Sequence, residues 1–578
     1  MTGAIRPGQL HSPMKLTDDS NLSDLFLARI AETPDAPAYR QYTGENWVDM
    51  TWGEVGREVG RWQAALRKEN LRPGDRVAVC LRNRTEWVLF DQAAIGLGLV
   101  TVPLYFDDRP ENMAFCINDA GARVLFLENG AIWPAMREQA KTIERVVCLN
   151  AIPPDDTRAL ALQHWLPPEG AAPARSPARA DDLVTLVYTS GTTGRPKGVM
   201  LSHKNILSNV LAAMKAIPSR ASDRFVSFLP LSHMFERTCG YYTAICCGGQ
   251  TVYARGISVL ADDIREQQPT VLIAVPRIFE RIWGRMQEQM PAGSPKRRLF
   301  DKSVEVGWRR FQGKAGAMDR LLWPVLRALV AKKLYHRLGG RIRLIIVGGA
   351  AFSPDLARVF IGLGLPIIQG YGLTETAPIL CANREHDNDP ASIGRPLEGI
   401  EMRLDESGEI LARGPNLMLG YWNKPEATAA VIDKDGWFHT GDLGRVRDGR
   451  FYITGRLKDV IVLSNGEKVS PTDVEQAILM DPAFEQVMLV GEGRPKLGLI
   501  AVSSVESEAE LCERANRQLH GFPGYTRIHH VARIVGPWSI ENGLLTPTMK
   551  VKRGEIERRF RAEIEAMYRR DLRTAGGT

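Results

Sequence analysis

The sequence lacks the features that mark secreted, metal-binding and membrane-spanning proteins. Its eight cysteines form no C-x-x-C pair and no disulfide-scaffold spacing, and its ten histidines show no metal-ligand spacing. No apolar run approaches the roughly 18–20 residues that cross a bilayer, and the first residues contain no apolar signal-peptide core. We therefore expect a cytoplasmic protein in a reducing environment, with peripheral membrane association left open.

An excess of charge of one sign is also missing. The 74 Lys and Arg residues oppose 67 Asp and Glu residues, and the resulting net charge of +7 is weak evidence for a polyanionic partner. The 44% hydrophobic and 24% charged content is that of an ordinary globular protein. At 578 residues the chain is too long for one core, so we expect two or more domains.

The most informative stretch present is Leu183–Gly198, which reads LVTLVYTSGTTGRPKG. Its first six residues have the apolar and β-branched character of a buried strand. The remainder is a small polar loop whose glycines, hydroxyls and N–H groups suit a phosphate chain, and Lys197 adds a positive charge. The Walker spacing G-x-x-x-x-G-K-[ST] is absent, which disfavours a kinase or plain ATPase. The predicted phosphate-binding residues are Thr189, Ser190, Gly191, Thr192, Thr193, Gly194 and Lys197.

A second strand-and-turn unit favours an aromatic base. Leu344–Val347 reads LIIV, typical of a buried strand, and small residues follow it. Ligands in open α/β sheets bind at the carboxyl ends of strands, so this turn leaves room for an adenine edge. The predicted base-binding residues are Gly349, Ala350 and Ala351.

The segment Gln369–Glu375, which reads QGYGLTE, follows about 20 residues later. Tyr371 offers a stacking face, Thr374 a hydroxyl, and Glu375 a hard carboxylate for Mg²⁺. In GWFHTGDL at residues 436–443, Asp442 stands beside a glycine and can accept both hydroxyls of a ribose at close range. The predicted nucleotide-binding residues of the first segment are Gln369, Gly370, Tyr371 and Gly372.

Together these motifs resemble those of the adenylate-forming (AMP-binding, ANL) superfamily of acyl-CoA synthetases, luciferases and nonribosomal adenylation domains. The resemblance runs from Leu22 to Arg553 with the motifs in the family order. It is most specific for long-chain fatty acyl-CoA synthetases in LPLSHMFER at residues 229–237, in a basic insertion, and in LLTPTMK at residues 544–550.

This resemblance implies an α/β fold in two parts. A large N-terminal domain of layered α/β sheets, residues 1–455, binds AMP and the acyl group, and a hinge joins it to a small mobile α+β domain, residues 456–578. The sequence GRLKD at residues 455–459 matches the family junction. There Arg456 reaches the ribose or phosphate, and Lys458 falls at the hinge. Gly466 opens GEKVSP, which resembles the loop that contacts CoA.

The resemblance also implies the reaction: ATP-dependent activation of a long-chain fatty acid through acyl-AMP, then transfer to CoA with release of AMP and pyrophosphate. The expected ligands are ATP, Mg²⁺ on Glu375, CoA and the fatty acid. Lys550 aligns with the catalytic lysine, in preference to Lys552 or Arg553, and acts with Thr374 on the α-phosphate. His233, exposed by a turn after the strand in Phe225–Arg237, has a positioning role near the acyl pocket.

Several alternatives stay open at this stage. The enzyme could be a fatty acyl-AMP ligase that loads an acyl carrier protein, or a ligase for medium-chain or aryl acids. A non-catalytic lipid-binding protein is disfavoured by the intact motif residues. The stretch Lys296–Arg343 holds 14 Lys and Arg residues against three acids. It predicts either a solvated helix face packed by its other side or a peripheral membrane contact. No nucleic-acid-binding motif accompanies it, and we expect no nucleic-acid partner.

Overall fold

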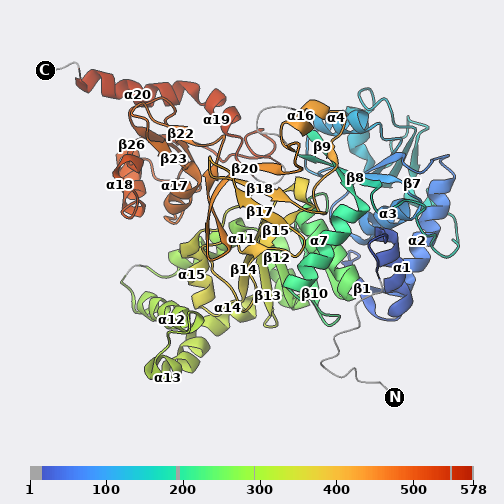
Figure 1. Cartoon of the computed structure of the whole chain (residues 1–578), viewed down its shortest axis with the longest axis horizontal. Helices are drawn as coiled ribbons and strands as arrows, with labels where there is room; N and C mark the ends of the chain where they lie inside the picture. The colour runs from blue at the N-terminus through green and yellow to red at the C-terminus, as the bar shows by residue number, and fades with distance from the viewer. Residues whose placement is uncertain (1–15, 190–194, 292, 547–549, 576–578) are drawn as a thin grey trace.

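The structure is a computed structural model that describes residues 16–189, 195–291, 293–546 and 550–575. It confirms the predicted fold class: a large N-terminal α/β region carries two extended sheets, and a smaller α+β domain follows at the C-terminal end (Figure 1). Among the helices of these described ranges, none has both the length and the apolar character needed to cross a bilayer.

A nine-stranded sheet forms the centre of the N-terminal region, in the order β16-β15-β14-β13-β12-β10-β11-β1-β2. Its strands from β10 to β14 pair in parallel, so the loops that follow β13 and β14 leave from the same edge. The strands are β1 (Pro37–Tyr42), β2 (Trp47–Thr51), β10 (Arg224–Ser227), β11 (Gln250–Tyr253), β12 (Val271–Ala274), β13 (Leu344–Val347), β14 (Ile367–Gly372), β15 (Ile379–Ala382) and β16 (Arg395–Pro396).

The second, eight-stranded sheet carries the predicted phosphate loop, in the order β19-β9-β8-β4-β3-β5-β6-β7. β8 and β9 form an antiparallel hairpin in which Thr189 pairs with Lys197. The segment 151–182 contributes β7 and a short helix, α6 (Leu162–Trp165). The strands are β3 (Arg76–Cys80), β4 (Val100–Pro103), β5 (Val124–Asn129), β6 (Arg145–Asn150), β7 (Ala159–Ala161), β8 (Leu183–Thr189), β9 (Lys197–Ser202) and β19 (Gly420–Tyr421).

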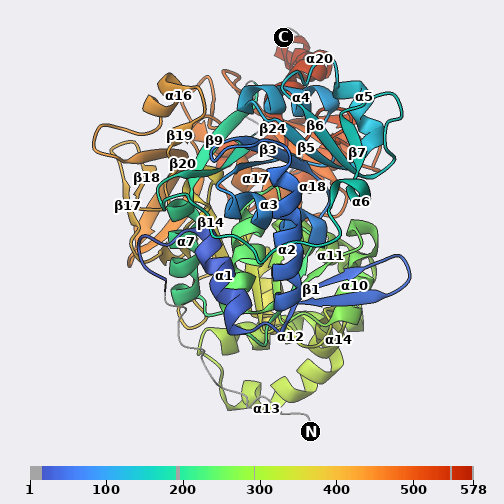
Figure 2. The same cartoon turned by 90° about the vertical axis from the view of Figure 1, so that its right-hand side faces the viewer.

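A group of helices packs against both sheets. α1 (Leu22–Glu32) begins with Asn21, whose side chain accepts from the backbone N–H of Asp24 in a reciprocal capping box. Its apolar face joins those of α2 (Trp52–Arg67), α3 (Thr85–Gly96) and α7 (His203–Ala216) in one core that includes side chains of both sheets (Figure 2). The layered arrangement fixes the two sheets relative to each other.

The remaining N-terminal helices cover the sheets and build a protruding corner at the lower left of Figure 1. They are α4 (Pro110–Ala120), α5 (Trp133–Met136), α8 (Met234–Glu236), α9 (Thr243–Cys247), α10 (Leu260–Gln267), α11 (Pro276–Glu288), α12 (Pro295–Phe311), α13 (Ala317–Leu326), α14 (Lys332–Arg337), α15 (Pro354–Gly362) and α16 (Pro425–Ala429). Two π-helical segments, η2 (Arg237–Tyr242) and η4 (Arg327–Ala331), continue α8 and α13.

A four-stranded sheet leads the chain from the large region into the C-terminal domain. Its order is β17-β18-β20-β21, and its members are β17 (Glu401–Leu404), β18 (Glu409–Arg413), β20 (Phe438–Arg447) and β21 (Arg450–Arg456). The C-terminal domain has its own core and consists of β22 (Ile461–Val462), β23 (Lys468–Val469), α17 (Pro471–Ile478), β24 (Gln486–Val490), β25 (Leu497–Val502), α18 (Glu508–Gln518), β26 (Ile528–Ile534), α19 (Arg553–Arg559) and α20 (Arg561–Ala575). The boundary at residue 456 stays a prediction.

Candidate active site

Two of the predicted nucleotide motifs meet at one edge of the nine-stranded sheet. Val347 at the end of β13 stands opposite Gln369 of β14, so the two following turns are neighbours. Gly349 has a φ of 78°, a left-handed conformation that glycine adopts without strain. Gln369 is buried, and its Oε1 atom has no hydrogen-bond partner within the described residues. A buried amide oxygen of this kind suits the exocyclic amine of an adenine.

Asp442 connects the two sides of this nucleotide site. It lies opposite Arg456 where β20 pairs with β21. Its Oδ1 accepts from Arg456 Nε at 2.8 Å, and its Oδ2 accepts from the Tyr371 hydroxyl at 2.6 Å. Burial, and then the Asp442 charge, raise the pKa of Tyr371 well above its ordinary value, so Tyr371 remains a donor. The structure therefore brings together three residues that the sequence placed in the nucleotide site.

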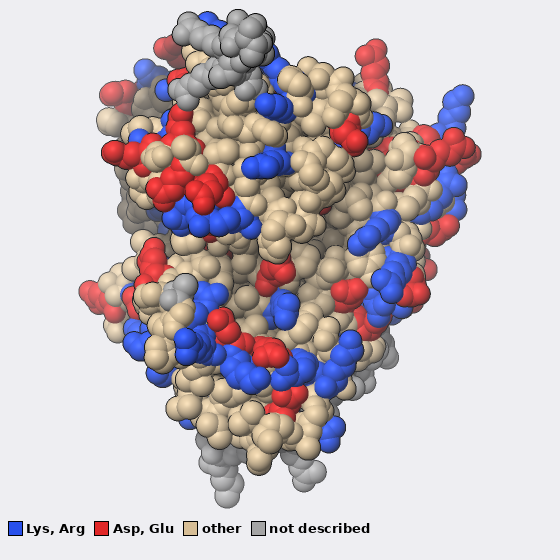
Figure 3. All heavy atoms as spheres, turned by 90° about the vertical axis from the view of Figure 1, so that its left-hand side faces the viewer, with Lys and Arg blue, Asp and Glu red and all other residues tan. Residues whose placement is uncertain are grey.

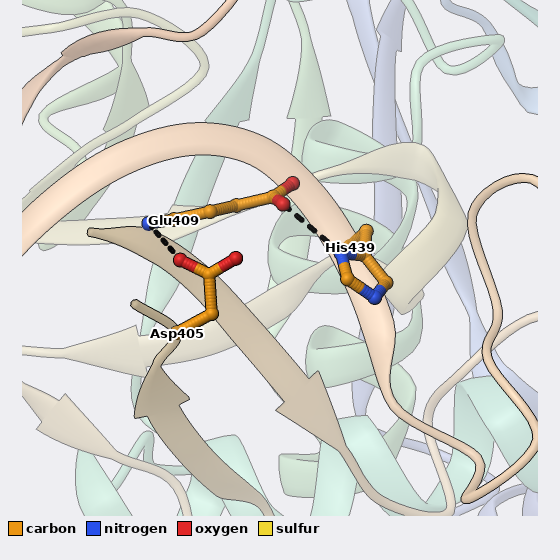
Figure 4. A group of neighbouring side chains, drawn as sticks. All are labelled: Asp405, Glu409 and His439. Carbon is orange, nitrogen blue, oxygen red and sulfur yellow. Dashed lines mark hydrogen bonds and ion pairs between the residues drawn. The ribbon is translucent and has the colours of Figure 1, made fainter. Parts of the chain in front are cut away.

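A second group of side chains supports the loop that carries Asp442 (Figure 4). Glu409 accepts from the Gly441 N–H at 2.7 Å through Oε1, and its Oε2 lies 2.9 Å from His439 Nδ1. Asp405 accepts from the Glu409 N–H at 2.8 Å. These three side chains lie close enough to hold an ion. The carboxylate oxygens already form hydrogen bonds with backbone N–H and imidazole groups. We therefore interpret these three side chains as support for the loop that carries Asp442.

Glu375 lies in η5 (Thr374–Thr376), directly after the Tyr371 segment. Its Oε1 accepts from the Tyr421 hydroxyl at 2.8 Å, and Met418 donates to its backbone carbonyl at 2.8 Å. Lys197 Nζ lies 4.8 Å from the centre of the Tyr421 ring. Tyr421 thus stands between the predicted phosphate-loop lysine and the predicted cation ligand.

Lys550 reaches this group from the C-terminal domain. Its backbone is held by Thr546, whose N–H donates to the Lys550 carbonyl at 2.8 Å and whose Oγ1 accepts from the Lys550 N–H at 3.0 Å. Lys550 is exposed to solvent. Partial desolvation and then the Arg456 charge lower the pKa of Lys550, whereas Asp442 and Glu375 act in the opposite direction. The Lys550 charge therefore interacts with the charged groups of the site.

The neighbours of Lys550 in the sequence have structural roles. Arg553 forms an ion pair with Glu475 and donates to the Leu489 carbonyl at 3.2 Å. Lys552 precedes α19 as its N-cap residue. The geometry therefore favours Lys550 among the three basic residues that the sequence left as candidates.

His233 is half-buried at the start of α8, so the expectation that a turn exposes it was wrong. Its Nδ1 accepts from the Phe235 N–H at 3.2 Å, which fixes the beginning of the helix. Burial and then the Lys550 charge lower the pKa of His233 to about 4, so the ring is neutral near pH 7. Phe235 packs on the turn after β13, where a Cβ added to Gly348 would lie 2.9 Å from its ring.

The predicted hinge and CoA-loop residues lie in exposed turns. Lys458 is exposed in the turn after β21, and Gly466 is exposed in the turn between β22 and β23, where its N–H donates to Leu463 at 2.9 Å. Ser190, Gly191, Thr192, Thr193 and Gly194 lie outside the described residues. The C-terminal domain also contacts the base-binding turn, because Gln476 Nε2 donates to the Ala351 carbonyl at 2.8 Å.

Comparison with known proteins adds to this geometry. Residues 26–422 match the family described as AMP-binding enzyme, and residues 458–572 match the AMP-binding enzyme C-terminal domain. The chain belongs to the AMP-binding enzyme family. This enzyme is 30% identical to the long-chain-fatty-acid–CoA ligase FadD15 of Mycobacterium bovis, over 98% of this chain and 100% of that protein.

Two further proteins extend the comparison of this AMP-binding enzyme. The chloroplastic long-chain-fatty-acid–[acyl-carrier-protein] ligase AEE15 of Arabidopsis thaliana is 26% identical, with 90% of this chain and 83% of that protein covered. A crystal structure of the anthranilate CoA ligase AuaEII with anthranoyl-AMP has a TM-score of 0.78 at 21% identity, and covers 95% of this chain and 99% of that one. The structural likeness shows that the fold is shared.

Sequence reasoning missed Tyr421, Glu409 and Gln476 in this AMP-binding enzyme. Tyr421 ends the segment GEILARGPNLMLGY, which has the family order, but nothing in the segment predicts a contact with Glu375, 46 positions away. Glu409 lies in the same segment, 32 positions before Gly441. A pattern within one element does not show such long-range contacts.

Glu236, within the LPLSHMFER motif, supplies a pH-dependent prediction. It is buried, and burial raises its pKa to about 8 from an unfolded value near 4.5. The folded protein therefore binds a proton that the unfolded chain releases, and the free energy of unfolding falls as pH rises from about 4.5 through 8. We expect Glu236→Gln to lack this pH-dependent loss. Its free energy of unfolding should therefore rise, relative to that of the native protein, by on the order of 3 kcal/mol between pH 5 and pH 8.

Denaturant unfolding of both proteins at several pH values in that range measures this effect. Glu398→Gln, at an exposed glutamate that pairs with Lys215, is the matched control and should follow the native curve. If the free energies of unfolding of native protein and Glu236→Gln change with pH in parallel, Glu236 is ionised in the folded state.

Proposed function

We propose that this AMP-binding enzyme activates a long-chain fatty acid with ATP through an acyl-adenylate, then transfers the acyl group to CoA and releases AMP and pyrophosphate. The observation that carries the proposal is the position of Lys550, whose charge interacts with those of Glu375, Asp442 and Arg456. The full-length similarity to a protein named as a long-chain-fatty-acid–CoA ligase supports the choice of acid and acceptor.

In the first step the fatty carboxylate attacks the α-phosphorus of ATP in line, and pyrophosphate leaves. An anion approaches a polyanion, so catalysis depends on position and on neutralisation of charge. Asp442 holds the ribose hydroxyls, and Tyr371 and Arg456 fix the orientation of its carboxylate. Lys550 and Thr374 stabilise the negative charge that builds on the α-phosphate and the carboxylate.

The β- and γ-phosphates are held by the loop from Thr189 to Lys197. Glu375 fits a Mg²⁺ ligand, because its carboxylate is a hard oxygen donor and only Tyr421 hydrogen-bonds it within the described residues. When bound, Mg²⁺ would neutralise charge on the leaving pyrophosphate. Tyr421 keeps the Glu375 carboxylate oriented and carries Lys197 on its ring face.

In the second step the C-terminal domain pivots at Lys458 and brings the loop at Gly466 to the acyl-adenylate. The CoA thiolate then attacks the acyl carbonyl, and AMP leaves. Hinge residues absorb φ/ψ change, and the exposed turn that holds Lys458 suits this role. The rotation must break the bond from Gln476 to Ala351 and the bond from Arg277 to the Glu485 carbonyl at 3.0 Å. Pyrophosphate release before rotation gives ping-pong kinetics.

The test is pyrophosphate release with ATP and Mg²⁺ across saturated acids from acetate to stearate, with CoA, with a phosphopantetheinylated acyl carrier protein, or with neither. We expect the highest kcat/KM between laurate and stearate, and turnover beyond one adenylate only with CoA. A peak at shorter or aryl acids would keep the adenylation chemistry and overturn the long-chain substrate. Discharge by the carrier protein alone would assign the carrier-loading activity named for the Arabidopsis relative.

A further inference from the structure

One helical face at the protruding corner of the large region is apolar and faces solvent. α13 continues into η4, and four large apolar side chains on this segment are exposed: Met318 by 65%, Leu321 by 72%, Val325 by 57% and Leu329 by 52%. Their spacing of three and four residues places them on one side of the helix. Contiguous exposed apolar surface of this kind marks an interaction site in a globular protein.

The opposite side of the same segment is firmly packed, so the exposed side is held in place. Trp323 lies against α12, where a Cβ added to Gly307 would come within 2.9 Å of its ring. Leu326 and Ala331 are buried. Asp319, at the start of α13, pairs with Arg309 of α12 at 2.5 Å. The apolar face is therefore a feature of the folded corner.

Positive charge is concentrated in the segment that carries this face. Residues 312–343 contain eight Lys and Arg residues and a single acid, Asp319, which Arg309 already neutralises. Lys332 and Lys333 follow Leu329 by three and four residues, so the helical repeat places them on the same side. Both are exposed, and neither makes a salt bridge within the described part of the chain. Figure 3 shows uncharged surface at the lower end of this side of the molecule, bounded by a band in which Lys and Arg are interspersed with Asp and Glu. Figures 1 and 2 both place α13 at the edge of the molecule.

We propose that this face of α13 and η4 docks on an anionic lipid bilayer, with the helix lying in the plane of the interface. The apolar side chains would enter the boundary between head groups and acyl chains, and the surrounding cations would bind anionic head groups. A nucleic acid would match the cations but leave Leu321 and Val325 in water. The charge and the apolar face together favour a lipid surface, and this inference does not depend on the catalytic reaction.

The experiment uses the full chain in flotation with phosphatidylcholine vesicles that contain or lack phosphatidylglycerol. We expect native protein to float with the anionic vesicles only, and less at high salt. Leu321→Glu combined with Val325→Glu, and separately Lys332→Glu combined with Lys333→Glu, should each weaken binding about tenfold or more. Val535→Glu, at another exposed apolar residue in the C-terminal domain, should float like native protein.

Folding and competing interactions are measured on the same variants. ATP–pyrophosphate exchange with a water-soluble acid should be unchanged in both double variants, because the substitutions lie on an exposed face away from the site. Native protein that stays unbound to both kinds of vesicle would overturn the inference, and so would native-like binding of Leu321→Glu with Val325→Glu. A native dimer that this variant separates, without vesicle binding, would assign the face to a second copy of the chain.

Discussion

Replacement of Lys550 by alanine should slow acyl-adenylate formation by about 10²–10³-fold, the usual cost of one group that stabilises transition-state charge. Transfer of the acyl group from supplied acyl-AMP to CoA should stay near the native rate. The physical reason is that Lys550 shares the field of Glu375 and Asp442 in the observed arrangement, and the rotation at Lys458 withdraws it before CoA attack. ATP–pyrophosphate exchange and thioester formation from synthetic acyl-AMP measure the two halves separately.

Lys552→Ala is the matched control, because Lys552 is another lysine of the same segment and its side chain makes no capping hydrogen bond at the N-cap position of α19. It should retain both half-reactions. Equal slowing of both halves by Lys550→Ala would contradict the rotation, and slower adenylation in Lys552→Ala than in Lys550→Ala would move the catalytic role to the other lysine.

Asp91→Ala should lower the free energy of unfolding by about 3–5 kcal/mol, because it leaves a buried guanidinium without its partner. Asp91 and Arg237 are both fully buried and lie 2.5 Å apart. Arg237 also donates to Thr185 of β8 and Thr101 of β4, each at 2.9 Å, and the Tyr242 hydroxyl donates to Asp91 at 3.0 Å. Chemical denaturation monitored by tryptophan fluorescence measures the loss.

Two further variants identify the cause of this loss. Glu401→Ala breaks the exposed pair with Arg413 and should cost less than about 1 kcal/mol. Asp91→Leu with Arg237→Met replaces the buried pair by apolar groups and should recover much of the loss. If Asp91→Ala costs no more than Glu401→Ala, the buried pair does not hold α3 to the eight-stranded sheet.

Arg237 also shows a limit of prediction from local sequence. It is the last residue of LPLSHMFER, which by resemblance belongs to the acyl pocket, and its position in the motif gives no sign of a structural role. The structure places it in a buried network that joins α3, β4 and β8. Asp91 lies 146 positions away from Arg237 in the sequence, and Thr185 lies 52 positions away, so a local pattern could not reveal these partners.

The fold class, the order of the motifs and the family could all be predicted from the sequence, because strand periodicity, glycine-rich turns and motif residues are local properties of short segments. The sequence also supplied Asp442, Tyr371 and Lys550 as candidates. The three-dimensional structure was needed to show that Tyr371 and Arg456 hold Asp442 and that Tyr421 orients Glu375. It was also needed to bring the Lys550 charge into interaction with this site. The exposure of the apolar face of α13 was decided in the same way. Burial and pairing depend on which distant segments pack together, and packing is a property of the whole fold.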